Sequence, residues 1–89
     1  MIKKILDNYY SNKLINYCKS CLQRYIIDIR ITETKTNVDI EIKMPKYNDK
    51  QFISIFNFHK GNAFIYLCEQ EEIKKILLER AKKYSESQV

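Results

Sequence analysis

The sequence of 89 residues is poor in glycine and proline, with one residue of each, and it has a single histidine. One glycine cannot build a glycine-rich phosphate loop, and the chain contains neither a nucleophile elbow nor an HExxH motif. Its apolar runs stay far below the ~18 residues of a membrane span, and its first residues lack the apolar segment of a signal peptide. We therefore expect a soluble cytoplasmic protein with no membrane partner, no cofactor and no enzymatic activity.

Cysteine is present three times, and an odd number agrees better with a reducing compartment than with a disulfide framework. Two of these residues form the motif Cys18-x-x-Cys21. A structural zinc site needs four ligands, and the sequence offers four candidates, the other two being His59 and Cys68. If both flank a second hairpin, as argued below, His59 and Cys68 lie roughly 20 Å apart at ~3.3 Å per strand residue. One zinc ion could not bind both, and we predict no metal site.

A redox pair is the other chemical interpretation of this motif. Reactive pairs are typical of a helix N-terminus, whereas Cys18 and Cys21 lie deep in a helical pattern, at a spacing poorly oriented for a disulfide. Together with Leu14, Leu22 and Tyr25 they continue an apolar stripe. We therefore interpret both cysteines as core residues, because free cysteine behaves as a small apolar side chain. A site of three cysteines without a fourth protein ligand remains the alternative.

The charge balance is basic, with a net charge of +5 and an isoelectric point near 9.1. A basic balance can indicate nucleic acid or an acidic protein as partner. Lys outnumbers Arg 13 to 3, however, whereas base readout and bidentate phosphate binding favour Arg. Ile, Lys, Asn and Tyr dominate the composition, and AT-rich codons encode them, so codon bias can also account for the lysine excess.

The first 25 residues show the apolar period of a helix. Steps of three and four connect Ile2, Ile5, Leu6 and Tyr9, and later Leu14, Cys18, Cys21, Leu22 and Tyr25. The polar cluster from Ser11 to Lys13 interrupts this pattern, and Ser11 could cap a second segment. We predict one long helix with a kink near Ser11, or two helices joined there.

The period then changes to two, which predicts a half-buried β-hairpin over residues 27–44. Charge selects its register. With Lys35-Thr36 at the centre of the loop, Arg30 lies opposite Glu41 and Asp28 opposite Lys43, whereas a shift by two residues apposes like charges. Cross-strand pairs contribute only about 0.2–1 kcal/mol each, but all of them favour the same register. Pro45 ends the second strand, and residues 46–50 form a polar connection.

Two further strands are predicted over residues 51–59 and 63–68, with Gly61 supplying a left-handed turn between them. Apolar residues occupy both alternating positions in these strands, with Phe52, Phe56 and Phe58 on one side and Ile53 and Ile55 on the other. Such strands are covered on both faces. Either two helices cover opposite faces of the sheet, or one face binds a partner.

The last segment, residues 69–84, is predicted to be a helix, with acidic residues in its first turn and Lys82 and Lys83 in its last turn. Residues 85–89 are expected to be a frayed tail. The order α-β-β-β-β-α with short connections predicts a single α+β domain over residues 1–89, with a four-stranded antiparallel meander sheet.

Two surfaces are candidate binding sites. The first is an apolar strand face, which we expect to bind a second copy of the chain or another protein; it comprises Phe52, Phe56, Phe58, Ile65 and Leu67. The second is the basic side of the last helix, which could contact phosphates; it comprises Lys74, Lys75, Arg80, Lys82 and Lys83.

The sequence thus favours a small, homodimeric, non-catalytic interaction protein that binds a protein partner. Short length and AT-rich codons would suit a phage or viral protein that inhibits a host complex, such as a defence system. The alternative function is sequence-tolerant nucleic-acid binding through the basic helix.

Overall fold

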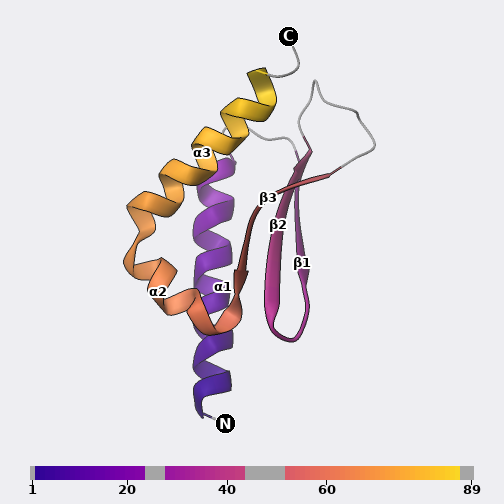
Figure 1. The fold of residues 1–89 in the computed structure, drawn as a ribbon. Helices are drawn as coiled ribbons and strands as arrows, with labels where there is room; N and C mark the ends of the chain where they lie inside the picture. Colours follow the sequence, from indigo (N-terminus) through magenta and orange to yellow (C-terminus); the bar gives the residue numbers. More distant parts are fainter. Residues whose placement is uncertain (1, 24–27, 44–51, 87–89) are drawn as a thin grey trace.

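A computed structural model describes residues 2–23, 28–43 and 52–86 of the chain, and within residues 84–86 it describes the backbone only. A long helix α1 (Ile2–Leu22) precedes three strands, β1 (Asp28–Glu33), β2 (Asn37–Lys43) and β3 (Ile53–His59). A 3₁₀ turn η1 (Lys60–Asn62) then leads into helices α2 (Ala63–Cys68) and α3 (Gln70–Glu86). The predicted α+β class is confirmed (Figure 1).

Helix α1 runs without interruption through the polar cluster at Ser11. Ser11 does not begin a second segment; it is a buried residue in the middle of one helix, only 1% exposed. At the C-terminal half of α1, the Tyr17 hydroxyl donates a hydrogen bond of 3.0 Å to the Gln70 carbonyl and thereby connects α1 to the start of α3. The predicted position of Tyr25 in this helix lies outside the described residues.

The β1–β2 hairpin has the register that charge predicts. Arg30 is the partner of Glu41 and Asp28 the partner of Lys43. The loop contains no glycine, and a threonine side chain holds the turn instead. The Thr34 hydroxyl oxygen accepts a hydrogen bond of 2.9 Å from the Asn37 amide. The predicted strand end at Pro45 and the polar connection over residues 46–50 lie outside the described residues.

Strand β3 pairs antiparallel with β2 but contains a bulge. Ile40 is the partner of Phe56 and Glu41 the partner of Ser54, so Ile55 is an extra residue with no partner on β2. Because the bulge shifts the alternation by one residue, Ile53 lies on the same side of the sheet as Phe56. The predicted division of Phe and Ile residues between two faces is therefore wrong.

The fourth strand is also wrong, because residues 63–68 form helix α2. The sheet of the described residues has three strands in the order β1-β2-β3. Gly61 lies in η1 and does not adopt a left-handed conformation. His59 begins this turn instead, since its Nδ1 accepts a hydrogen bond of 3.0 Å from the Gly61 amide. Chain reversal after β3 is thus achieved by helical turns.

The helices lie on one side of the sheet, so the molecule has two layers (Figure 1). The core between them is made of apolar side chains from α1, β2, β3, α2 and α3; the fully or nearly fully buried ones are Leu14, Ile15, Cys18, Leu22, Val38, Ile40, Ile42, Ile55, Phe56, Phe58, Ala63, Ile73, Leu77 and Ala81. The other face of the sheet is polar. One helical layer therefore suffices to cover the apolar strand residues.

Helix α3 extends to Glu86, so residues 85 and 86 of the predicted frayed tail are helical, and residues 87–89 lie outside the described part. Among the described residues, no helix is both long enough and apolar enough to cross a membrane.

Candidate functional site

The residues predicted to form an apolar strand face do not lie on one exposed surface. Phe56 and Phe58 are buried in the core, with 7% and 3% of their surface exposed. Phe52 is half-buried, with the Arg30 guanidinium carbon 4.3 Å from the centre of its ring. Leu67 packs against the core from α2, and only Ile65, also on α2, is well exposed. The strand face itself is the inner face of the sheet.

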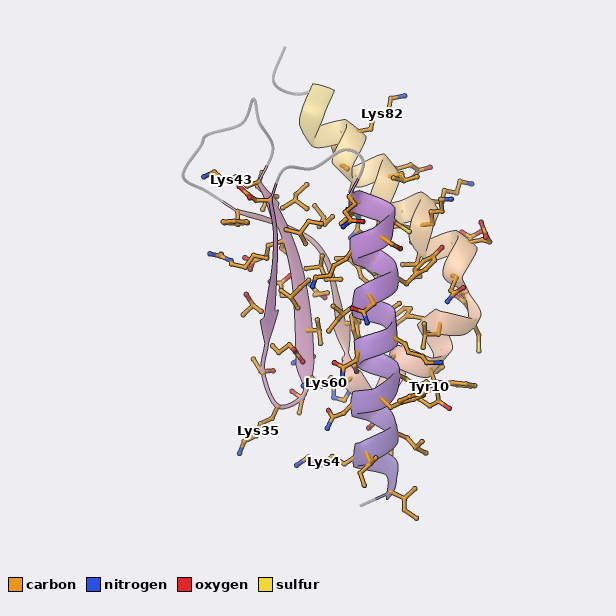
Figure 2. The ribbon with its side chains drawn as sticks, turned by 180° about the vertical axis from the view of Figure 1, so that it is seen from behind. Lys4, Tyr10, Lys35, Lys43, Lys60 and Lys82 are labelled. Carbon is orange, nitrogen blue, oxygen red and sulfur yellow. The ribbon has the colours of Figure 1, made fainter. Side chains whose placement is uncertain are left out.

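Most of the large exposed apolar side chains of the described residues lie instead on the first half of α1. No residue from Ile2 to Tyr10 is fully buried, although the structure describes all of them. Ile2, Ile5, Leu6 and Tyr9 are between 44% and 76% exposed. The first turns of α1 extend past the β1–β2 loop and past α2 (Figures 1 and 2). The protein thus presents a row of large apolar side chains on a projecting helix.

The two halves of α1 have their apolar faces on opposite sides. At 3.6 residues per turn, Ile2, Ile5, Leu6 and Tyr9 form one stripe, and the stripe that contains Leu14, Cys18 and Leu22 lies roughly half a turn away. The second stripe faces the core and the first faces away from it. The change occurs where Tyr9 is followed by Leu14, because a step of five residues breaks the spacing of three and four. This step is the signal in the sequence that could have revealed two faces rather than one kinked stripe.

An aromatic cluster extends this surface onto α2. The Tyr9 and Tyr10 rings lie 5.2 Å apart, and the Tyr10 and Phe64 rings lie 4.9 Å apart. Phe64 and the adjacent Ile65 are 53% and 57% exposed. We call this set the N-terminal apolar surface; it comprises Ile2, Ile5, Leu6, Tyr9, Tyr10, Phe64 and Ile65.

The charged residues beside this surface are basic or face away from it. Lys13 lies at its edge, with its ammonium 4.9 Å from the centre of the Tyr9 ring. Lys3 and Lys4 are exposed on other sides of the helix, and Figure 2 shows Lys4 pointing toward the β1–β2 hairpin. The carboxylate of Asp7 lies on the side of Gly61. No charged side chain therefore interrupts the apolar stripe between Ile2 and Tyr9.

The cysteine motif is part of the core, as the spacing predicts. Cys18 is fully buried, Cys21 packs against the core, and both are free thiols. Burial raises the pKa of the Cys18 thiol to about 12, and the neighbouring Cys21 adds to this effect. A thiol in this environment is neither a nucleophile nor a ready metal ligand.

The rate of thiol modification should distinguish the exposed Cys68 from the buried Cys18. We expect the exposed Cys68 to react with a thiol reagent at least ~100-fold faster than Cys18, because only the thiolate reacts and the pKa of Cys18 is far above its ordinary value. A colorimetric thiol assay, with and without denaturant, measures this difference. Cys68→Ser should remove the fast phase; a fast phase that persists and labels Cys18 would contradict the burial.

The other candidate zinc ligands do not join the motif. His59 uses Nδ1 to accept a hydrogen bond from the Gly61 amide at the end of β3, and Cys68 is exposed at the end of α2. Among the residues that the structure describes, no three His, Cys, Asp or Glu side chains are grouped so as to bind a metal ion. His59 and Cys68 do not flank a second hairpin, because Ala63–Cys68 is helix α2, so the separation predicted for them from strand geometry does not apply.

The basic residues of α3 that were predicted to contact phosphates differ in their surroundings. The Arg80 guanidinium donates a hydrogen bond to the Ile55 carbonyl, which is the backbone of the bulge residue. Arg80 is therefore a structural residue of the α3–β3 contact. The lysines at positions 74, 75, 82 and 83 are exposed, but exposed glutamates at positions 71, 72 and 79 lie among them.

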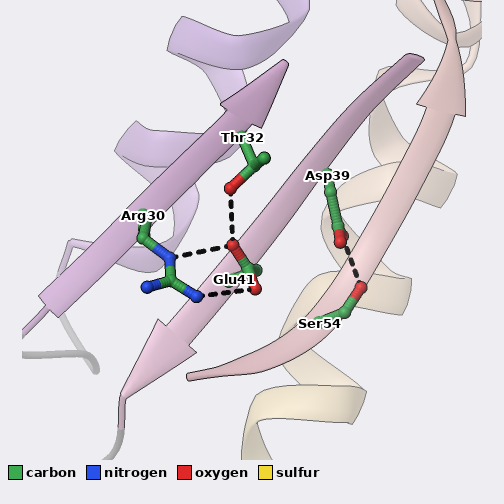
Figure 3. A network of polar contacts seen from close by, with 5 residues as sticks. All are labelled: Arg30, Thr32, Asp39, Glu41 and Ser54. Atoms are coloured by element: carbon green, nitrogen blue, oxygen red, sulfur yellow. Dashed lines mark hydrogen bonds and ion pairs between the residues drawn. The ribbon is translucent and has the colours of Figure 1, made fainter. Parts of the chain in front are cut away.

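The outer face of the sheet carries a polar network (Figure 3). The Arg30 guanidinium donates two hydrogen bonds of 3.0 and 3.1 Å to the Glu41 carboxylate, and the Thr32 hydroxyl donates a third of 2.8 Å. The Ser54 hydroxyl donates to Asp39. Hydrogen bonds from Arg30 and then Thr32 hold the pKa of Glu41 below its ordinary value of 4.5. This network stabilises the sheet, and the carboxylates of Glu41 and Asp39 both accept hydrogen bonds within it.

The lowered pKa of Glu41 predicts a pH dependence of folding. A carboxyl group whose pKa is lower in the folded state contributes its full stabilisation above the unfolded-state value, near 4.5, and loses it as the pH falls through the folded-state value. We therefore expect the free energy of unfolding to fall with acidification in this window, and to fall less in Glu41→Gln. Urea titrations at several pH values measure this; identical slopes for both proteins would contradict it.

Comparison with known proteins assigns the chain to no family, since no family model matches it and neither a curated protein nor a solved structure is significantly similar to it.

Proposed function

We propose that this chain is a small, non-catalytic interaction protein that binds another polypeptide through its N-terminal apolar surface. The observation that carries the proposal is the row of exposed Ile2, Ile5, Leu6 and Tyr9 on the projecting half of α1. The predicted function class is retained, but the binding surface moves from the sheet to the helices.

Spacing and size support a protein as ligand. Side chains at positions i, i+3, i+4 and i+7 are the anchors by which an amphipathic helix docks into an apolar surface, and Ile2, Ile5, Leu6 and Tyr9 have this spacing. With Phe64 and Ile65 the exposed apolar area is on the order of several hundred Å², which is the size that marks interaction sites on soluble proteins. Large apolar side chains on the solvent side of a helix otherwise bring no stability to the fold.

A photo-cross-linking experiment tests the proposal. A benzophenone amino acid at Ile5 should form adducts with a polypeptide, whether another protein or a second copy, in extracts that contain the natural partner. The matched control places the same group at Asn16, which is exposed on the same side of α1 but outside the apolar stripe. Equal or stronger labelling from Asn16 would contradict a specific surface around Ile5.

A further inference from the structure

We infer that the polypeptide bound at the N-terminal apolar surface is a second copy of this chain, with the projecting halves of the two α1 helices packed antiparallel. This inference rests on the proposed function and names its partner. The exposed stripe, the helix dipoles and the size of the surface each support it.

The stripe is self-complementary in an antiparallel pair. If the two-fold axis passes between Ile5 and Leu6, these two residues meet their symmetry mates at the axis, and Ile2 faces Tyr9 of the partner subunit. Each anchor then has an apolar counterpart, and by symmetry the set is used twice, as an isologous interface requires. The aromatic cluster of Tyr9, Tyr10 and Phe64 lies at both ends of this contact.

The helix dipoles favour the antiparallel arrangement. In a parallel pair the positive N-terminal ends of the two helices would lie side by side, which is unfavourable. In the antiparallel pair the helix dipoles oppose each other. Asp7 lies on the side of Gly61 and is not displaced by the contact.

The size of the surface is comparable with that of a protein interface. A standard interface buries about 800 Å² per partner, and the N-terminal apolar surface of one chain provides on the order of several hundred Å² of apolar area. The polar residues around this surface would contribute further buried area. Since each chain carries a net charge of +5, the attraction must come from this apolar area. Salt screens the repulsion between the two chains, so the dimer should tighten as salt rises.

The mass of the purified full chain in solution tests the inference. We expect sedimentation equilibrium to give twice the chain mass of 10.8 kDa, with a dissociation constant that decreases at higher salt. Leu6→Lys should weaken association by roughly 100-fold or more, because it places a charge beside the two-fold axis. Asn16→Lys, on the same side of α1, is the matched control and should leave the dimer intact. Circular dichroism verifies that both variants remain folded.

Disulfide trapping tests the orientation in a Cys68→Ser background. Leu6→Cys should cross-link to itself across the two-fold axis, and Ile2→Cys should cross-link to Tyr9→Cys in a mixture but not to itself. Self-cross-linking of Ile2→Cys would overturn the antiparallel arrangement. A wild-type monomer at all salt concentrations, or a dimer unaffected by Leu6→Lys, would overturn the inference as a whole. If that monomer still forms specific adducts from Ile5, the proposed function stands and the partner is a different protein.

Discussion

Phe56→Asp should unfold the protein. Phe56 is 7% exposed and lies between the sheet and the helices, within 6 Å of the Phe58 and Tyr66 rings. Truncation to Ala at such a site costs about 3–5 kcal/mol, and a buried carboxylate without a partner costs more. Because small domains are stable by only about 5–15 kcal/mol, we expect Phe56→Asp to lack a cooperative thermal transition by circular dichroism.

The matched control is Ile65→Asp. Ile65 is 57% exposed on α2, so this substitution should change the free energy of unfolding of the monomer by roughly 0.5 kcal/mol or less. The two variants introduce the same carboxylate into residues that the sequence assigned to one interface. If Phe56→Asp stayed folded, the strand face would be a surface after all, and the two-layer packing described above would be wrong.

Ser11→Ala should stabilise the protein, although it removes a polar group from the middle of α1. The Ser11 hydroxyl is buried and no hydrogen-bond partner for its oxygen is found among the described residues. An unsatisfied buried hydroxyl costs about 1–3 kcal/mol, and alanine is also the better helix former. We expect a gain of about 1–2 kcal/mol, measured as a higher urea midpoint with an unchanged slope.

Ser20→Ala provides the comparison for this result. Ser20 is exposed on the same helix, and its hydroxyl donates a hydrogen bond of 2.8 Å to the Tyr17 carbonyl. Ser20→Ala should change the free energy of unfolding by close to zero, because the loss of this hydrogen bond is offset by the higher helix propensity of alanine. Destabilisation by Ser11→Ala, relative to Ser20→Ala, would mean that the Ser11 hydroxyl is hydrogen-bonded in the folded protein.

Local patterns in the sequence determined the faces and the register of the first hairpin. Alternation of apolar and polar residues defined its faces, and the pairing of Arg30 with Glu41 and of Asp28 with Lys43 defined its register. Both kinds of information act between neighbouring strands joined by a short loop, so no distant contact was needed. The acidic start and basic end of α3 and the burial of Cys18 were determined in the same way, by spacing along one helix.

The candidate site was decided by tertiary structure. An apolar stripe indicates that a helix has an apolar face, but not what covers that face, and α1 has one stripe against the core and another exposed.

Residues 63–68 are apolar in both alternating positions and suit a strand or a helix equally. They become α2 because β3 ends at the His59 turn and the chain continues along α1, where Phe64 contacts Tyr10. The bulge residue Ile55 likewise has a distant partner, since Arg80, 25 residues away, donates a hydrogen bond to its carbonyl. Contacts at such separations are set by the packing of whole elements, and a single sequence does not contain them as a local pattern.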